Sequence, residues 1–529
     1  MIKKNWKKGG KFAFVLTVCI AVATLHMGCQ MEVERIIERE VPVSSPEQGP
    51  ARFVFLFIGD GMGEAQITAA EIYAHVNNPT LSGMSIRPGR PGNIDVNRLE
   101  FSRFPVRGSQ TTHDFNSFVT DSASAGTAIA SGRKTTAGSI NINPAIDPNV
   151  EFKTIAEYAR DAGMRVGIVT SVTLTHATPA AFYGKVLSRN DTETLAQQLI
   201  DSGFHFFAGG NIVSNANRSD VFLAQAQAAG YNVVRTRNEL ETLTSASGKV
   251  IAIPPAASLQ DGGALFYEID RDPTNAEHWT LADLTRKGIE VLYNPNGFFM
   301  VVESGKIDWA GHANDAVAII YDILAMDQAV RLALEFAARH PEETLIVVTG
   351  DHETGGMTIG RGGSHNTDFS LLNSQTMSHV EIQRQLPNIR RTLTTGNTIA
   401  NIDVFLQQTF GININDGNGS MPSTIRSGGR ETFSSAERAA IETAFLQSFG
   451  AQVGNGSGSS NSAFGNTIIQ ILNNRSGIGW TTTGHTGIPV PVYAFGTRAT
   501  LFSGNYDNTD IFFKLASAMG LEVGPAPSP

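Results

Sequence analysis

The chain has 529 residues, of which 17% are charged and 41% are hydrophobic, and its formal net charge is −9. This composition is typical of a folded protein, and the length allows more than one folding unit. The negative charge argues against nucleic acid as the main partner, so we expect no nucleic-acid-specific binding. An anionic substrate is still compatible with this charge, because a bound metal ion can reverse the local field.

The first 29 residues have the features of an export signal. Lysines at the start precede an apolar segment over residues 12–24, which is short for a membrane span. Gly28-Cys29 then resembles a bacterial lipoprotein cleavage site, although His26 stands where that pattern usually has leucine. Cys29 is therefore a candidate lipid anchor, with plain secretion or an uncleaved anchor as the alternative. Residues 30–50 read as a tether, and we expect a periplasmic or cell-surface location.

Apolar runs alternate with helical patterns along the rest of the chain. Because uninterrupted apolar runs fit strands buried on both faces, this alternation predicts an α/β/α sandwich around a mostly parallel sheet. The strand runs lie at residues 53–58, 166–170, 298–302, 344–348 and 490–495, and helical patterns lie at 154–162, 191–202 and 316–338.

The composition changes over residues 361–479, where Gly, Ser and Asn cluster at 415–427 and again at 450–465. Helical patterns remain at 380–391 and 435–449. We interpret this stretch as an inserted cap between a core at residues 51–360 and its completion at 480–529. It could make dimer contacts or shade the site, and its composition favours neither. Both cysteines, Cys19 and Cys29, precede the core, so the core has no disulfide and no cysteine metal ligand.

Ser122 follows an acidic residue and precedes a run of small residues that suits the start of a helix. Unpaired backbone N–H groups converge at such a position, and they stabilise an anion or an alkoxide. No Gly-x-Ser-x-Gly sequence surrounds this serine, so a metal ion is a better candidate activator than a histidine base. A helix start with an ordinary cap is the alternative.

Residues with ligand-type side chains follow the apolar runs. Asp308 and His312, four residues apart, suit one zinc ion, and the pair Asp351-His352 and the isolated His485 add further nitrogen and oxygen ligands. The oxygen ligands that suit magnesium are Asp60, Thr178 and Glu303, and Arg189 could grip an oxyanion with two hydrogen bonds. Each residue alone has an ordinary structural explanation, such as a turn, a helix cap or a solvated surface; the combination does not.

Eight short segments together resemble the alkaline phosphatase family. They are residues 58–63, 120–123, 177–181, 302–303, 307–308, 312–313, 349–352 and 484–487, and the resemblance runs from about residue 53 to 521 apart from the insertion. It implies the family's fold, a homodimer, and hydrolysis of small phosphate monoesters through a phosphoserine. The implied cofactors are two Zn²⁺ and one Mg²⁺.

The resemblance also implies a role for each matching position. One zinc would be held by Asp308, His312 and His485, and the other, which also holds the oxygen of the nucleophile Ser122, by Asp60, Asp351 and His352. The magnesium would be held by Asp60, Thr178 and Glu303, and the phosphate by Arg189. The surroundings of the magnesium and of the phosphate would include His176 and Trp309, two substrate-binding positions that vary within the family. His365, in the insertion, is a candidate contact at the rim of the site.

Two other functions are compatible with this sequence. Related metal-dependent enzymes of the same fold cleave phosphodiesters or sulfate esters, but Arg189 and the third site favour a doubly charged monoester. A metal- or phosphate-binding surface protein without catalysis would be expected to lack the nucleophile or part of the ligand set, and this chain keeps both.

Overall fold

The computed structural model describes residues 49–76, 98–362, 367–393, 399–413, 424–427, 429–431, 433–449 and 463–524. The chain divides into two compact units, Met1–Pro42 and Val43–Pro529. The predicted signal peptide, Cys29 and nearly all of the tether lie outside the described residues, and so does His365. Among the described residues, no helix combines the length and the apolar character that a bilayer span requires.

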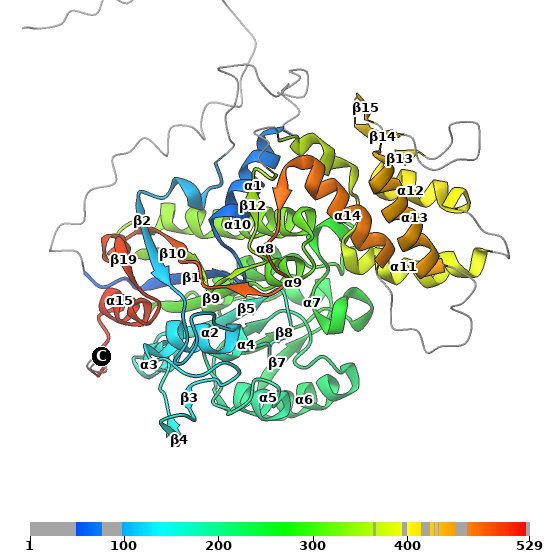
Figure 1. Ribbon diagram of the computed structural model, residues 1–529. Helices are drawn as coiled ribbons and strands as arrows, with labels where there is room; N and C mark the ends of the chain where they lie inside the picture. Colours follow the sequence, from blue (N-terminus) through cyan, green and yellow to red (C-terminus); the bar gives the residue numbers. More distant parts are fainter. Residues whose placement is uncertain are drawn as a thin grey trace, which may run out of the picture. The chain divides into compact units, whose positions relative to one another are not determined.

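The second unit is built on a ten-stranded sheet in the order β19-β2-β18-β10-β1-β9-β5-β6-β8-β7 (Figure 1). Strand β18 runs antiparallel to both of its neighbours, and the other neighbouring strands pair in parallel. The strands are β1 (Phe53–Gly59), β2 (Val106–Thr111), β5 (Arg165–Thr170), β6 (Phe206–Ala208), β7 (Tyr231–Val234), β8 (Lys249–Ala252), β9 (Phe298–Ser304), β10 (Thr344–Gly350), β18 (Val490–Gly496) and β19 (Gly504–Asp507).

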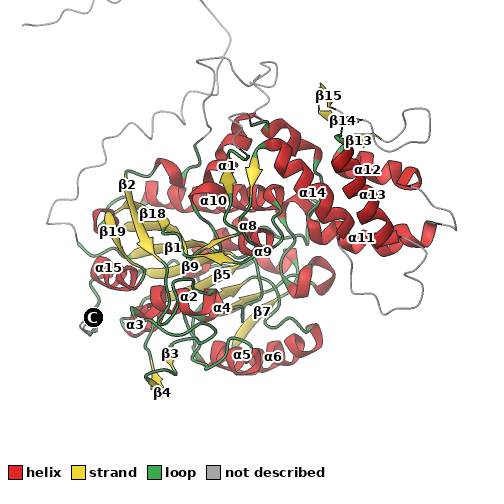
Figure 2. Ribbon diagram, viewed as in Figure 1, coloured by secondary structure: helices red, strands yellow, loops and turns green. Residues whose placement is uncertain are grey.

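Helices cover both faces of this sheet (Figure 2), because successive side chains of each buried strand point to opposite faces. In β1, Phe53, Phe55 and Phe57 join one apolar cluster, whereas the intervening residues 54, 56 and 58 join another. The first cluster includes residues of α1 (Glu64–Val76), α8 (Leu281–Leu292) and α10 (Ala316–Arg339), and the second includes residues of α2 (Ser122–Ser131), α3 (Ile155–Asp161), α5 (Thr192–Asp201) and α15 (Thr509–Met519).

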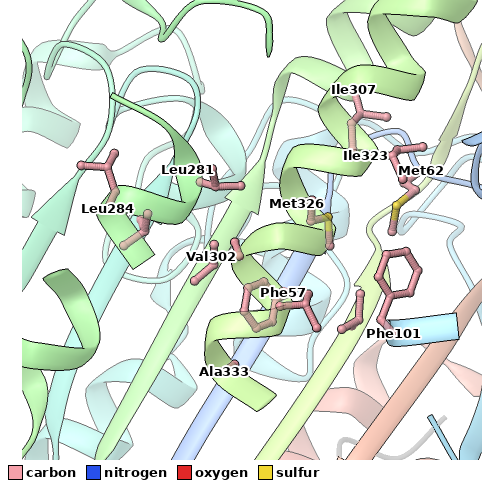
Figure 3. Packing of buried hydrophobic residues seen from close by; sticks show 14 of the residues in the cluster. Phe57, Met62, Phe101, Leu281, Leu284, Val302, Ile307, Ile323, Met326 and Ala333 are labelled. Atoms are coloured by element: carbon pink, nitrogen blue, oxygen red, sulfur yellow. The ribbon is translucent and has the colours of Figure 1, made fainter. Parts of the chain in front are cut away.

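Figure 3 shows the first of these clusters, where Phe57 and Val302 pack with Met326 and Ala333 of α10. The predicted α/β/α sandwich with a mostly parallel sheet is confirmed. The five predicted strands correspond to β1, β5, β9, β10 and β18, and the three predicted helices correspond to α3, α5 and α10. The apolar runs located β1, β5, β9 and β10 well because each of these strands is buried almost throughout.

Four helices after residue 378 have an apolar core of their own, which includes Leu406, Phe445, Phe464 and Leu472. They are α11 (His379–Thr392), α12 (Asp403–Phe410), α13 (Ser435–Phe449) and α14 (Ala463–Ser476). The predicted helical patterns at 380–391 and 435–449 coincide with α11 and α13. Two carboxylates of the main body, the buried Asp315 and the half-buried Asp270, hold the start of this region. Asp315 accepts from the backbone N–H of His379 at 2.8 Å, and Asp270 accepts from the backbone N–H of Ser378 at 2.7 Å.

Several shorter elements complete the described chain. Two pairs of two-residue strands, β11 (Glu353–Thr354) with β17 (His485–Thr486) and β12 (Thr358–Ile359) with β16 (Ile478–Gly479), connect the segment after β10 to the segment before β18. The others are β3 (Ile142–Asn143), β4 (Asp147–Glu151), α4 (Ala177–Ala180), α6 (Ala216–Ala228), α7 (Arg237–Glu241), α9 (Lys306–His312), β13 (Ile412–Asn413), β14 (Thr424–Ser427) and β15 (Gly429–Glu431). The sequence did not predict the two-residue pairs.

Candidate active site

Three neighbouring parallel strands end with acidic side chains at the same edge of the sheet. Asp60 follows β1, Asp351 follows β10, and Glu303 is the penultimate residue of β9. The register pairs Gly59 of β1 with Gly350 on one side and with Ser304 on the other, so the three carboxylates are brought to one place. The crevice at the carboxyl ends of the strands is where open α/β sheets bind their ligands.

The inner cluster consists of Asp60, Asp351 and His352, all fully buried. The Nε2 atom of His352 lies 3.4 Å from Asp60 Oδ1 and 3.4 Å from Asp351 Oδ2. Neither of these two carboxylate oxygens makes a hydrogen bond within the described part of the chain. Their partner oxygens are occupied, since Asp351 Oδ1 accepts from the N–H of Gly61 and Asp60 Oδ2 accepts from the hydroxyl of Thr178.

Buried polar atoms are nearly always paired, so these free oxygens require an explanation. A cation shared with His352 Nε2 would supply it, and the mixed oxygen and nitrogen ligands fit zinc.

The pKa shifts of the inner cluster also favour a bound cation. Burial and the neighbouring carboxylates of Asp351, Asp308 and Glu303 raise the pKa of Asp60 well above its usual value. Burial and Asp308 raise the pKa of Asp351 to about 7, and burial together with His485 lowers the pKa of His352 well below its usual value. The protein therefore concentrates carboxylates where they repel one another, an arrangement that a bound cation stabilises.

The outer cluster consists of Asp308, His312 and His485. Helix α9 carries the first two residues four positions apart, and the pairing of β17 with β11 brings His485 to them. The Nε2 atoms of His312 and His485 lie 3.3 and 3.4 Å from the two oxygens of Asp308 and 3.2 Å from each other. Burial acts to raise the pKa of Asp308, but hydrogen bonds from the two imidazoles hold it well below its usual value.

Backbone carbonyls orient both imidazoles of the outer cluster. The Nδ1 atom of His312 is 2.6 Å from the carbonyl oxygen of Thr483, and that of His485 is 2.8 Å from the carbonyl oxygen of Thr120. A proton on each Nδ1 satisfies these contacts, and the Nε2 atom that faces Asp308 can then offer its lone pair to a metal ion. Outer partners of this kind are usual for histidines that bind a metal, so the outer cluster also fits zinc.

A third cluster joins Asp60 and Glu303 to His176. The Nδ1 atom of His176 lies 3.9 Å from Asp60 Oδ2 and 3.8 Å from Glu303 Oε1. Neither this nitrogen nor Glu303 Oε1 makes a hydrogen bond among the described residues, whereas Glu303 Oε2 accepts from the hydroxyl of Thr170. The family resemblance implied only that His176 lies near the magnesium and the phosphate, but in the structure its Nδ1 atom lies among the candidate ligand atoms of this cluster.

Ser122 begins α2 beside the inner cluster. Its Oγ lies 3.3 Å from His352 Nε2 and its side chain is almost fully buried. Asp121 caps the helix by accepting from the backbone N–H of Ser124, and it also accepts a hydrogen bond from Arg189 at 2.9 Å. The same carboxylate therefore holds both the helix that begins at Ser122 and the candidate phosphate-binding arginine. The prediction that a helix starts at Ser122 is confirmed.

Arg189 contacts Asp121 through one guanidinium nitrogen and His176 through the other, and Trp309 packs against His176. The second guanidinium nitrogen of Arg189 is 3.2 Å from His176 Nε2, and the ring of Trp309 meets the His176 ring edge-on at 5.8 Å. All of the core site residues expected from the sequence are thus gathered at one edge of the sheet.

Sequence reasoning missed the residues that support the ligands. The hydroxyl of Thr354 donates to Asp308 and lies 3.3 Å from His352 Nδ1, so it touches both the outer and the inner cluster. Thr170 supports Glu303 in the same way. Their positions in the sequence could have identified them. Thr354 lies two residues after the candidate ligand His352, and Thr170 ends β5, which pairs with the strand that carries Glu303.

The comparisons with known proteins agree with this geometry. The family model described as alkaline phosphatase matches residues 51–521. Alkaline phosphatase 4 of Bacillus subtilis (strain 168) is 31% identical over 516 residues, which cover 94% of this chain and 95% of the relative. Alkaline phosphatase 3 of the same organism is 32% identical over 490 residues, which cover 90% of both chains.

Solved structures are similar to the chain over most of its length. The cold-active alkaline phosphatase of the psychrophile Shewanella sp. has 28% identity and a TM-score of 0.69, with 88% of this chain and 99% of that chain covered. The Thermus thermophilus alkaline phosphatase has 27% identity and a TM-score of 0.68, with 91% and 93% covered. With its candidate metal ligands gathered at the carboxyl edge of the sheet, the protein is a phosphatase and belongs to the alkaline phosphatase family.

Proposed function

We propose that the protein hydrolyses phosphate monoesters to an alcohol and inorganic phosphate through a phosphoserine on Ser122. The observation that carries this proposal is the position of Ser122 Oγ, at a helix N-terminus and 3.3 Å from a histidine whose cluster contains two unpaired buried carboxylate oxygens. The outer and inner clusters would each hold one Zn²⁺. One Mg²⁺ would be held by Asp60, Thr178 and Glu303, with His176 beside it.

Bound metal ions would supply Lewis-acid stabilisation of negative charge on the oxygens of the serine and of the leaving alcohol. The side chains of the site bind the phosphoryl group and supply the nucleophile. Arg189, oriented by Asp121, binds two oxygens of the phosphoryl group. Ser122 releases its hydroxyl proton to solvent, and its Oγ, whose negative charge is stabilised by the N–H groups at the start of α2, attacks phosphorus in line. The phosphorus–oxygen bond of the ester breaks, and the departing alcohol oxygen takes a proton from water.

The second half of the reaction releases the serine. A water molecule gives a proton to solvent and attacks phosphorus from the side that the alcohol vacated. The bond from phosphorus to Ser122 Oγ breaks, and this oxygen takes a proton back from solvent. Inorganic phosphate then leaves Arg189. Positioning and charge stabilisation carry most of phosphoryl-transfer catalysis, and both are built into the fixed geometry of the strand ends.

The test compares an aryl phosphate, a bis-aryl phosphate and an aryl sulfate at alkaline pH. Each rate is measured after chelation and again after zinc and magnesium are restored. We expect a large preference for the monoester that chelation abolishes and that requires both metals to return. A preference for the diester or the sulfate would instead assign the alternative activity, and the roles of Arg189 and Glu303 would be withdrawn first.

We further propose that residues 1–29 direct export, that Cys29 anchors the mature chain through lipid, and that the protein forms a homodimer in which residues 361–479 are an insertion. Mass analysis of the mature N-terminus tests the first two points, since a lipid-modified Cys29 has a distinct mass. Light scattering of the purified chain tests the dimer, and a monomer at micromolar concentration contradicts it.

A further inference from the structure

Exposed apolar side chains lie in two segments that lead to the active site. The side chain of Phe118 is 91% exposed, and those of Val119 and Ile488 are 43% and 53% exposed. Phe118 and Val119 shortly precede Ser122, and Ile488 shortly follows His485. We refer to these three side chains as the apolar rim. Single exposed apolar residues are common, so their placement together beside a site is the informative feature.

The two segments that carry the apolar rim touch each other. A Cβ atom at Gly487 would lie 2.7 Å from the carbonyl oxygen of Phe118 and 3.8 Å from Cγ2 of Val119, so the backbones approach closely there. Two residues away along each segment, Nδ1 of His485 lies 2.8 Å from the carbonyl oxygen of Thr120. The apolar rim is therefore fixed to the outer cluster by the same contacts that orient His485.

The exposure of the site residues shows where the alcohol part of an ester must lie. The carboxylates of the inner and third clusters are fully buried, whereas the side chains of Arg189 and His312 are 25% and 42% exposed. A phosphoryl group between Ser122 and Arg189 would have the buried inner and third clusters on its inner side. Its alcohol substituent must therefore project past the outer cluster towards solvent, which is the side where the apolar rim adjoins His485.

We propose that the apolar rim binds the apolar part of the alcohol, and thus that the site favours phosphate monoesters of alkyl or aryl alcohols over those of strongly hydrated alcohols. The rim is continuous with the catalytic site through the contacts between residues 118–120 and 485–487, which is the reason to assign it to the substrate. This inference rests on the proposed phosphatase function and adds the class of leaving group. Burial of the substrate's methylene groups against these side chains supplies the preference.

The experiment uses the full chain with its metals and a series of ethyl, butyl and hexyl phosphates. The three alcohols have nearly equal pKa values, so the chemistry stays constant while apolar area grows. We expect kcat/KM to rise about twofold for each methylene, or about 16-fold from ethyl to hexyl, as half-covered methylenes would give. In the double variant Phe118→Ser/Ile488→Ser the hexyl-to-ethyl ratio falls to about 2 or 3, mainly because kcat/KM for hexyl phosphate decreases.

The matched control is Val404→Ser, which removes a side chain that is 66% exposed on α12. It is expected to keep the full ratio. Equal values of kcat/KM for the three esters in the unmodified protein would overturn the proposal, and so would a double variant that keeps the 16-fold ratio. If the double variant loses an oligomer seen by light scattering while the ratio stays unchanged, the apolar rim binds a second copy of the chain and the substrate assignment is wrong.

Failure of the underlying function has a different signature. If no ester of the series is hydrolysed, or if Ser122→Ala hydrolyses all of them normally, the phosphoserine proposal fails. An enzyme that depends on Ser122 and shows a flat response to chain length leaves the phosphatase proposal intact and overturns only the role of the apolar rim.

Discussion

The inner and outer clusters use the same ligand types but are held in different ways. Asp60 and Asp351 extend directly from the ends of neighbouring buried strands, so the sheet itself fixes the inner cluster. The outer cluster lies on a seven-residue helix and a two-residue strand, and backbone carbonyls orient its histidines. The inner cluster carries strong like-charge repulsion, whereas in the outer cluster each carboxylate oxygen faces an imidazole. The strongest repulsion between carboxylates therefore lies where strand pairing fixes the backbone on both sides.

The largest expected effect concerns catalysis beside the inner cluster. Ser122→Ala should lower kcat by at least about 1,000-fold, because no other group can accept the phosphoryl group, and its zinc content should not change. The measurements are turnover of an aryl phosphate and elemental analysis. The control is Ser131→Ala at the other end of α2, whose hydroxyl donates to the carbonyl of Thr127. Near-normal turnover of Ser122→Ala would exclude the covalent route.

The metal-free protein should depend on pH through the inner cluster. The pKa of Asp351 is raised from 3.8 to about 7 in the fold, chiefly by burial. Its contribution is therefore fully favourable below pH 3.8 and is lost as pH rises towards 7, because the unfolded chain releases this proton first. The free energy of unfolding should fall by a few kcal/mol over that interval, measured by denaturant titration after chelation. Asp351→Asn should flatten the curve, and an equally steep curve would contradict the assignment.

Removal of the Asp60 carboxylate charge should have opposite effects on stability in the metal-free and the metal-bound protein. In the metal-free protein, Asp60→Asn should raise the unfolding free energy by about 2 kcal/mol, because it relieves repulsion from Asp351, Asp308 and Glu303. With zinc and magnesium added, the same variant should be less stable than the unmodified protein, because one ligand charge is missing. Calorimetry of both forms provides the comparison. A variant that is destabilised in both forms would show that repulsion among these carboxylates does not govern the stability of the metal-free site.

A change in stability of similar size is expected at Glu353, which supports the outer cluster without belonging to it. Its buried carboxylate accepts hydrogen bonds from Gln66, from the hydroxyl of Thr486 and from the backbone N–H groups of residues 356 and 357. Glu353→Ala should destabilise the fold by about 2 kcal/mol and weaken zinc binding at the outer cluster about tenfold, through loss of the contact to Thr486. Glu353→Gln should recover part of both. Unchanged zinc affinity in Glu353→Ala would limit this residue to a structural role.

The smallest expected difference is kinetic. A chelator should remove metal from the outer cluster first, at least about tenfold faster than from the inner cluster, because the side chain of His312 is 42% exposed and the inner ligands are fully buried. Time-resolved loss of zinc during chelation should therefore show two phases. Asp308→Ala should remove the fast phase and leave the slow one. A single phase of the same amplitude as the total zinc would contradict the distinction between the clusters.

The amino-acid sequence was sufficient for five of the ten strands of the large sheet, β1, β5, β9, β10 and β18, and for the residue types at their ends. It did not predict the other five, which are β2, β6, β7, β8 and β19. Runs such as residues 53–58 and 344–348 are apolar because both faces of the sheet are covered, and that burial leaves an unambiguous pattern in the sequence. Ligand-type residues directly after such runs predicted a site at one edge of the sheet. The helix at Ser122 was predictable because its cap is local, three residues across.

The contacts that finish the site required the tertiary structure, because they join residues far apart in the chain through groups that every residue has. The carbonyl of Thr120 orients His485 across 365 positions, and the carbonyl of Thr483 orients His312 across 171. Backbone carbonyls leave no residue-specific signal, and neither do two-residue strands such as β11 and β17. Local chemistry therefore determined which side chains could bind metal, and long-range packing decided which atoms of those side chains face one another.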